Sequence, residues 1–543
     1  MPSSSRGNTA SARAFPPWLT TAILLFLARG TFYCFLQPLW EGYDEWAHVA
    51  FIHAIATTGH LPARADPIPS EIADSLAATP EPYSAEPPPQ SLTRDQFWRL
   101  TDAERADRLQ HPPRGGSLFQ YEAQQPPLYY VLLALPYRVV WGLPVSARVL
   151  FLRLLSLALA ALVLPLAWRI ALGVFPTDAG ARSAVLLLVA MPGLFVDLAR
   201  VANDSLAIVC CAAVIFCAQQ AAGACTLRPW LWLGAALGAA LLAKAYALAL
   251  VPMLPLAAAI AWIRRPSSRH TTRQGSLAAF AVAMLIAGWW YLQTWWITGS
   301  LSGEQLQAAA AGIPFAQKWS ALFALPWRSV IDSAAYTHIW LSGWSFLSLR
   351  SWMYRVFEAA ALLAAIGIIL RARRILRTGK VLGTGRIFLA SSACLLLAIG
   401  LLFHSFEIFL AKGIAAGIGW YFYAIAAAEP AVALAGYAAI FGPRAASRAI
   451  ANVALLFLAL DLYTVHLIQA PYYAGLTAHA TTGSIRAFHW SDLAQAGGLT
   501  SIVPRLAAFS PSGPSPLALA LSWTAYAAAT IILGIMLFRR TGK

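Results

Sequence analysis

Two acidic residues that follow the first apolar segment are the first side chains with a chemical use. Asp44 and Glu45 come shortly after a run long enough to cross a membrane, and His48 follows them. Desolvation at a membrane interface raises the pKa of a carboxylate and makes it a stronger base. If a helix begins here, Asp44 and His48 share one face because they are four residues apart. The alternative is that both acids only open a helix, where negative charge suits the helix dipole.

A second charged group lies between later apolar runs. Arg200, Asn203 and Asp204 join two runs, and Lys244 stands at a hairpin between the next two. Asn203 and Asp204 could cap a helix while Arg200 pairs with Asp204, or they could belong to a catalytic site. Lys244 is costly near lipid unless it snorkels to water or meets an anion, and a phosphate at the outer leaflet is such an anion.

Four further side chains are candidates for substrate binding. Gln125 precedes a Pro-Pro step that opens a short aromatic and apolar helix containing Tyr129, a composition typical of a segment in the headgroup zone. Lys412 and Tyr421 lie in and after a later loop. A plain interfacial anchor is the competing interpretation for Tyr129.

Metal and nucleotide chemistry find little support in the sequence. The order Asp44-Glu45-x-x-His48 does not place two histidines on one ion, as His-Glu-x-x-His does, so no metal site is predicted. A divalent cation that bridges Asp44 or Glu45 to a phosphate stays open. The chain has neither a GxxxxGK nor a GxGxxG motif, which argues against a nucleotide-driven pump.

The composition indicates that a membrane surrounds these residues. Of 543 residues, 59% are hydrophobic and 11% are charged, whereas a soluble domain carries about 25% charged residues. The formal charge of +16 does not indicate a nucleic-acid partner, because the basic residues lie in short loops between apolar runs. We therefore expect an all-α polytopic membrane protein surrounded by membrane lipids.

About twelve runs are long enough to span a bilayer. They lie near 17–37, 148–170, 182–197, 205–222, 229–244, 246–263, 275–297, 354–371, 386–408, 416–440, 448–467 and 516–538. The apolar run 126–142 is expected not to cross, because a crossing there would move the later arginine clusters to the outer side, against the positive-inside rule. We expect it to be an interfacial or re-entrant helix.

This topology predicts a short cytoplasmic tail at 1–16, a cytoplasmic C-terminus and a plasma-membrane location. Spans 2–7 occupy 148–297, spans 8–11 occupy 354–467, and the last span with its tail occupies 516–543. Three extracytoplasmic loops result, at 38–147, 298–353 and 468–515. The first loop carries 13 of the 23 acidic residues. Any chemistry is expected on the outer face.

Four segments in this order resemble the GT-C superfamily of polytopic glycosyltransferases. More narrowly, the chain resembles the family 39-like group of protein O-mannosyltransferases and lipid A aminoarabinose transferases, and a related set of uncharacterised bacterial membrane proteins. The segments are Tyr43-Asp44-Glu45, Gln125-Pro126-Pro127-Leu128-Tyr129-Tyr130, Asn203-Asp204-Ser205-Leu206-Ala207 and Gly288-Trp289-Trp290-Tyr291-Leu292.

The resemblance implies a GT-C-like fold and an inverting transfer from a polyprenyl-phosphate sugar to an acceptor hydroxyl. The family's acid of the first outer loop, which acts on the acceptor, maps to Asp44 with Glu45 beside it, and a later acid maps to Asp204. Two departures stand out. Gln125 replaces a frequent histidine, and Trp420-Tyr421 replaces an Arg-Tyr pair after Gly419. Another cation must then bind the donor phosphate, with Lys412, Lys244 and Arg200 as candidates.

Two other functions stay open at this stage. A transporter or flippase of a lipid-linked saccharide would share the membrane location, but it predicts inverted repeats and charges along a pathway. Few charges lie mid-span, mainly Arg29, Arg153 and Asp461, and the sequence shows no internal repeat. A non-catalytic scaffold for envelope assembly would need neither Asp44 nor Asp204. The sugar, the acceptor (lipid, glycan or protein), any metal and the oligomeric state are not predicted.

Overall fold

A computed structural model provides the structure of the chain. It describes residues 15–81, 91–175, 177–303, 309–310, 312–378, 385–480, 483–508 and 515–541. Most of the predicted N-terminal tail, 1–16, lies outside the described residues.

The described chain is predominantly helical, which confirms the prediction of an all-α polytopic membrane protein. Nine of its helical segments are long and apolar enough to cross a membrane, or up to eleven if each of two bent pairs is one span. The nine are Pro17–Leu36, Val145–Val174, Asp204–Ala221, Ala245–Arg264, Pro266–Thr298, Ser351–Thr378, Gly385–Lys412, Pro443–Tyr473 and Pro516–Arg540.

Two predicted spans are broken by a bend. In one, α9 (Asp178–Ala190) meets α10 (Pro192–Leu198) at 59°. Pro192 lacks an amide hydrogen and cannot continue the helical bonding of α9, so the chain turns there. In the other, the 3₁₀ helix η6 (Gly419–Ile425) meets α21 (Glu429–Phe441) at 84°. Such breaks expose backbone groups that a site can use.

One short helix explains the remaining difference from the expected count, and a second is the run that was not expected to cross. The predicted span 229–244 is α12 (Arg228–Ala243), which has 16 residues and falls just short of the usual spanning length. The run 126–142 contains α6 (Leu128–Val139), whose 12 residues are too few to cross a bilayer. A non-crossing helix was expected at this place.

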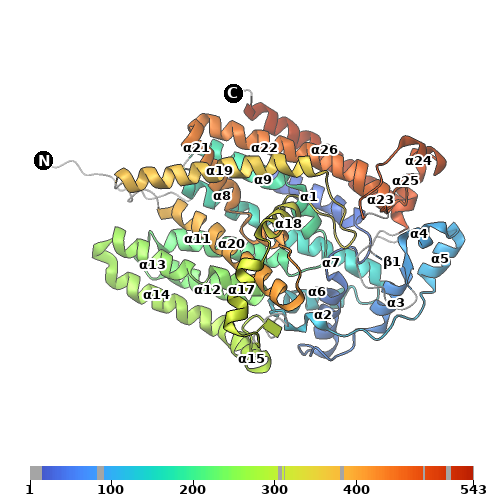
Figure 1. The fold of residues 1–543 in the computed structure, drawn as a ribbon, viewed down its shortest axis with the longest axis horizontal. Coiled ribbons are helices and arrows are strands. Elements are labelled where there is room, and N and C mark those ends of the chain that lie inside the picture. Colours follow the sequence, from blue (N-terminus) through green and yellow to red (C-terminus); the bar gives the residue numbers. More distant parts are fainter. Residues whose placement is uncertain are drawn as a thin grey trace.

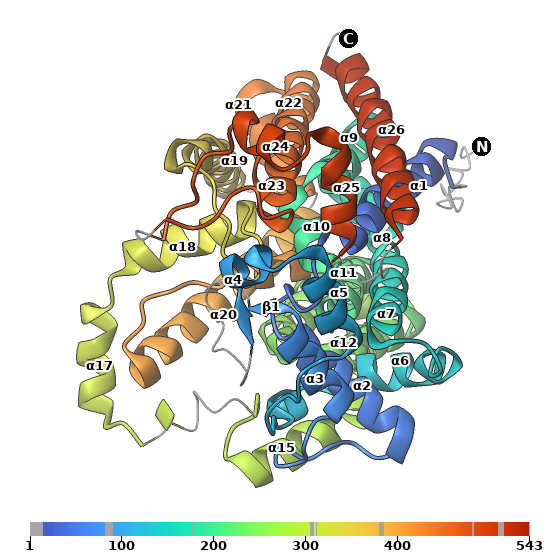
Figure 2. The ribbon, with the colours of Figure 1, turned by 90° about the vertical axis from the view of Figure 1, so that its right-hand side faces the viewer.

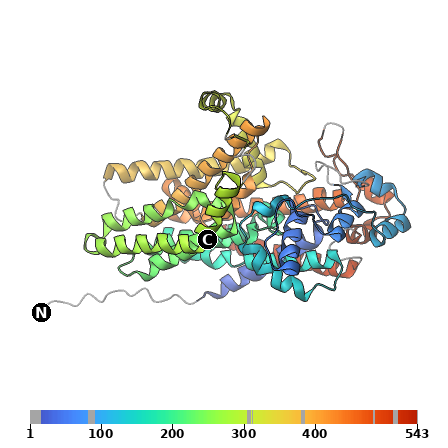
Figure 3. The same cartoon turned by 90° about the horizontal axis from the view of Figure 1, so that it is seen from below.

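The bundle is covered at one end by a cap, which we define as residues 38–81 and 91–144 together with α24 (Trp490–Gln495) and α25 (Leu499–Ala507). Figure 1 shows the long helices running side by side, with the cap at the right-hand end, and Figure 3 shows the same division from below. Figure 2 looks onto the cap. Two two-residue strands, β1 (Pro80–Glu81) and β2 (Leu92–Thr93), pair in parallel within it.

The cap contains helices whose ends are encoded locally. α2 (Glu45–Thr58) and α3 (Ser70–Ala78) come first, followed by α4 (Arg94–Arg99) and α5 (Asp102–Gln110). The hydroxyl oxygens of Thr93 and Thr101 accept hydrogen bonds from the backbone amides of Gln96 and Glu104. The side chains of Gln96 and Glu104 accept in turn from the backbone amides of the two threonines. This reciprocal capping satisfies amides that would otherwise lack partners.

A buried ion pair links the first span to the last two. Arg29 of α1 (Pro17–Leu36) donates to Asp461 of α22 (Pro443–Thr464) at 2.7 Å, and both side chains are completely buried. The hydroxyl of Tyr526 in α26 (Pro516–Thr541) donates to the same carboxylate at 2.6 Å, and Tyr33 of α1 also bonds to it. The charges are satisfied by one another, as buried charges must be.

Removing one member of this pair should destabilise the bundle. Asp461→Leu leaves the Arg29 guanidinium buried and unpaired, which costs about 3–5 kcal/mol. Thermal unfolding of the purified chain in nanodiscs should therefore shift to lower temperature. The double variant Arg29→Met/Asp461→Leu removes both charges and should recover most of the loss. Equal unfolding of the single and double variants would show that the pair is not coupled.

Candidate functional site

Asp44 lies in a turn between α1 and α2 that few residue types tolerate. Its backbone is left-handed, with φ 57°, a conformation that suits aspartate and asparagine better than most side chains. The turn passes close to Arg200, since a Cβ added to Gly42 would lie 2.5 Å from the Arg200 Cβ. Glycine at position 42 therefore allows the turn to rest on Arg200.

The Asp44 side chain is half-buried and does not cap α2. Instead, one of its oxygens accepts a hydrogen bond from the Tyr121 hydroxyl. Burial raises the pKa of Asp44, while the hydrogen bond from Tyr121 and the positive charges of Arg200 and Lys244 oppose that shift. The carboxylate is thus oriented and only partly desolvated, which suits a base.

Arg200, Asp204 and Lys244 form a buried charge cluster next to this turn. Arg200 donates to Asp204 at 2.8 Å, and the Lys244 ammonium lies 2.6 and 2.7 Å from the two Asp204 oxygens. Asp204 begins α11 (Asp204–Ala221), whereas Lys244 follows the last residue of α12. The ends of α10 and α12 and the start of α11 therefore bring the cluster together.

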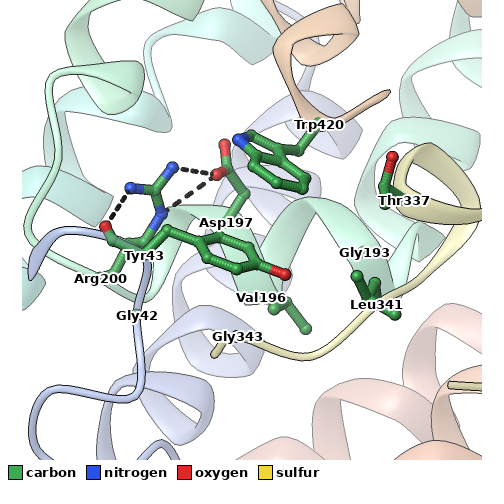
Figure 4. Close-up of a pocket in the computed structure, with 10 residues that line it drawn as sticks. All are labelled: Gly42, Tyr43, Gly193, Val196, Asp197, Arg200, Thr337, Leu341, Gly343 and Trp420. Atoms are coloured by element: carbon green, nitrogen blue, oxygen red, sulfur yellow. Dashed lines mark hydrogen bonds and ion pairs between the residues drawn. The ribbon is translucent and has the colours of Figure 1, made fainter. Parts of the chain in front are cut away.

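Asp197 completes the cluster on the other side of Arg200. Figure 4 shows the Asp197 carboxylate receiving two bonds from the guanidinium, at 2.6 and 3.2 Å, while a third bond of 2.8 Å goes to the Tyr43 carbonyl. When all these side chains are ionised, the cluster has one excess negative charge, because three carboxylates (Asp44, Asp197 and Asp204) face two cations (Arg200 and Lys244). An entering anion must compete with these carboxylates.

Glu45 points away from Asp44. It is fully buried and bonded to Arg153, with an Nε–Oε1 distance of 2.6 Å, and it also accepts the Val201 amide at 2.9 Å. Arg153 in turn donates to backbone carbonyls at the end of α1, including that of Gln37 at 2.7 Å. This geometry ties the Asp44 turn to the bundle and keeps the Glu45 side chain away from solvent.

The remaining predicted residues divide between the cluster and its surroundings. The side-chain amide of Asn203 donates to the Gln125 side chain and to the Ala243 carbonyl, both at 3.1 Å, and so links the cap to α12. It makes no hydrogen bond to the N-terminus of α11. Tyr129 is buried with its hydroxyl 2.7 Å from that of Ser156, outside the charge cluster.

Tyr421 and Lys412 have different positions relative to the cluster. The Lys244 ammonium lies 5.0 Å from the centroid of the Tyr421 ring, within cation–π range. Lys412 is exposed at the end of α20 (Gly385–Lys412), and the ion pairs of the cluster do not include it. The Gly288–Leu292 segment lies on the π-helix η4 (Met284–Gly288) and on α15 (Trp289–Thr298). Trp289 is 46% exposed, as a membrane-facing aromatic would be.

Several site residues were not predicted. Tyr121 donates to Asp44 and the Tyr246 hydroxyl lies 3.3 Å from Asp204, whereas Asp197 accepts from Arg200. The sequence does contain a pattern that indicates Asp197, because it lies at the end of an apolar run, three residues before Arg200, and a charge there needs a partner. No such pattern indicates Tyr121, because its contact with Asp44 spans 77 residues.

The structure brings no metal-binding group together in the part of the chain that it describes. Among those residues, no three His, Cys, Asp or Glu side chains are placed to hold one ion. His48 is committed to a hydrogen bond with the Tyr130 hydroxyl, at 2.7 Å.

Helical spans, a cap at one end and a charge cluster between them define a multi-pass membrane protein. A family model described as "Predicted membrane protein (DUF2142)" matches residues 26–428. Because this is more than half of the chain, the protein belongs to that family. No curated protein matches its sequence.

Two solved structures match almost the whole of this chain. ArnT from Cupriavidus metallidurans bound to undecaprenyl phosphate is 13% identical with a TM-score of 0.46, over 96% of this chain and 77% of that one. Arabinosyltransferase EmbB from Mycobacterium smegmatis is 13% identical with a TM-score of 0.43, over 98% of this chain. The chain spans 43% of EmbB, less than half of its length.

Burial of His48 should make stability depend on pH. Burial, and then the charges of Lys244 and Arg200, lower the pKa of His48 well below its usual range. An unfolded histidine takes up a proton as the pH falls below about 6.5, whereas folded His48 does not. This difference favours the unfolded state, so stability is lost as the pH falls below that value. His48→Gln should lose less stability between pH 8 and pH 5.5 in thermal unfolding. Equal losses in both proteins would contradict a buried neutral imidazole.

Proposed function

We propose that this protein is an inverting glycosyltransferase that moves a sugar from a polyprenyl-phosphate donor to an acceptor hydroxyl on the outer face of the membrane. The observation that carries the proposal is the Asp44 carboxylate, which is oriented by Tyr121 and partly open to solvent beside the buried Arg200–Asp204–Lys244 cluster. At the end of a helical bundle, the cations can meet the phosphate of a membrane lipid while the neighbouring base accepts a proton from the acceptor hydroxyl. The GT-C resemblance of the sequence supports the same reaction.

The reaction balances with the groups at the site. The acceptor oxygen attacks C1 of the sugar and loses its proton to Asp44. The bond from C1 to the phosphate oxygen breaks, and its electron pair leaves with the lipid phosphate. Attack from the opposite face inverts the configuration at C1. A positioned base contributes roughly 10²–10⁴-fold to such a rate.

Arg200 and Lys244 are the proposed phosphate ligands. Arg200 has five N–H donors, and its four hydrogen bonds to Asp197, Asp204 and Tyr43 leave one donor on Nη1. Lys244 has three donors, of which two face Asp204. Each cation can therefore offer one donor to a phosphate without leaving Asp204. Asp204 holds both cations in place and moderates their charge, so that the product phosphate can leave.

Glu45 has a positioning role in this proposal. Its carboxylate is held by Arg153 and the Val201 amide, so it fixes the direction in which the chain enters α2. Asp44 precedes it and is aimed by the same turn. We therefore assign the proton transfer to Asp44 and not to Glu45.

The test of the proposed base is Asp44→Asn in the source organism. Envelope glycans and glycolipids of a deletion strain, complemented with wild type or variant at matched expression, are compared by mass spectrometry. We expect a sugar unit to be missing from the deletion and not restored by Asp44→Asn, which keeps the left-handed backbone and the side-chain shape. Asp107→Asn, which changes a 76%-exposed acid of the same cap, should restore the sugar. Restoration by Asp44→Asn would instead favour a flippase or a scaffold.

Opposite effects on phosphate binding should separate Asp204 from Lys244. Lys244→Met removes a ligand and should weaken binding of undecaprenyl phosphate by roughly tenfold, the equivalent of one modest charge-assisted bond. Asp204→Asn removes the competing carboxylate and should strengthen it. Binding is measured in nanodiscs by the rise in unfolding temperature with added lipid, which also reports whether each variant folds. Weaker binding in both variants would contradict the competition between Asp204 and phosphate.

A further inference from the structure

A continuous strip of aromatic rings leads away from the charge cluster. Tyr246, next to Asp204, lies 5.6 Å from Tyr421 between ring centroids, and Tyr421 lies 5.9 Å from Trp420. Trp420 stacks on Tyr43 at 4.3 Å with nearly parallel planes, as Figure 4 shows. We define the aromatic strip as Tyr246, Tyr421, Trp420, Tyr43, Trp344 and Phe346.

The far end of the strip is held in an unfavourable conformation. Phe346 has a left-handed backbone, with φ 45°, which is rare for a bulky residue and occurs where the surrounding structure enforces it. Its ring is 37% exposed and lies 6.0 Å from that of Tyr43. A strained residue that shows a large apolar ring to solvent gains little stability for the chain, so the conformation needs another reason.

Glu41 enforces this conformation. Its buried carboxylate accepts the Ser345 amide at 3.0 Å and the Ser345 hydroxyl at 2.8 Å, and its carbonyl accepts the Trp344 amide at 2.9 Å. A Cβ on Gly343 would lie 2.0 Å from the same carbonyl. The loop between α18 (Trp327–Ile339) and α19 (Ser351–Thr378) is therefore fixed to the segment that carries Asp44.

Polar groups accompany the rings. The Tyr43 hydroxyl is buried and has no hydrogen-bond partner among the described residues. It points into a small cavity of about 10 Å³, lined by Gly193, Leu341 and Trp420, which is the room that one water-sized group needs. A hydroxyl group inserted there would satisfy Tyr43. Arg200 borders the same cavity and keeps its charge beside the strip.

We propose that the aromatic strip is an acceptor subsite and that the acceptor is a saccharide chain. The inference rests on the proposed function, since it places the acceptor hydroxyl at Asp44. Sugar rings present flat C–H faces that pack on aromatic rings and hydroxyl edges that need polar partners. The exposed Phe346 and the half-buried Trp344 and Trp420 offer ring surface, and the Tyr43 hydroxyl offers a polar partner. The strip's several rings in a row suit several consecutive sugars better than a single hydroxyl of a protein or a lipid.

Binding to native oligosaccharides tests the proposal. The probes are oligosaccharides released by mild acid from the envelope polysaccharide of the source organism, separated by length and labelled at the reducing end. The full chain in nanodiscs should bind longer fractions about tenfold more tightly than single sugars, since stacked rings add to affinity. Phe346→Asn, which removes the ring and tolerates the left-handed backbone, should abolish this gain with length. Phe346→Tyr keeps the ring and should preserve it.

Controls distinguish this site from a structural role and from the proposed reaction. Phe346→Asn should unfold no earlier than the wild type, because it relieves strain, whereas a structural Phe346 would give earlier unfolding. Phe323→Ala, which removes a 71%-exposed ring of α17 (Phe315–Ala324), should not change binding. Asp44→Asn should bind the oligosaccharides normally.

The outcomes separate the two proposals. The acceptor subsite would be overturned if affinity did not rise with oligosaccharide length, or if it rose equally in Phe346→Asn. This holds even if Asp44→Asn abolishes transfer in cells. Ring-dependent binding in a protein whose Asp44→Asn variant still restores the envelope sugar would support the saccharide site and overturn only the reaction.

Discussion

Arg200 fixes the relative positions of three chain segments, and the geometry of the site depends on it. Its guanidinium bonds to Asp197 at the end of α10, to Asp204 at the start of α11 and to the carbonyl of Tyr43. The first two contacts hold the end of α10 against the start of α11, and the third holds the turn that carries Asp44. A buried charge with so many partners is expensive to move, because each displacement exposes a carboxylate without its counter-charge. The site is therefore preorganised before any ligand arrives.

The sequence predicted well what depends on hydrophobicity and local order. Long apolar runs became helices, and the short run at Leu128–Val139 became a helix that cannot cross, because length and charge pattern decide both. Asp44, Arg200, Asp204 and Lys244 were recognised as unusual because charge near lipid needs a reason. What could not be predicted is which partner each charge takes.

The pairings escaped prediction because they join distant segments. Glu45 was expected to act beside Asp44, yet its partner Arg153 lies 108 residues away and turns it inward. Tyr121 and Phe346 gave no pattern at all, since their importance comes from the fold around them. Neighbouring residues in a turn point in different directions, so adjacency in sequence does not imply a shared role.

The left-handed turn at Asp44 also limits how this protein can change over time. Asparagine is one of the few residues that accept this backbone, and aspartate and asparagine codons differ by one base. The smallest step away from activity in the proposed mechanism thus leads to a chain that still folds, inserts and keeps its cap. Relatives that carry asparagine at this position would be intact, non-transferring copies, free to acquire a binding role in the same membrane.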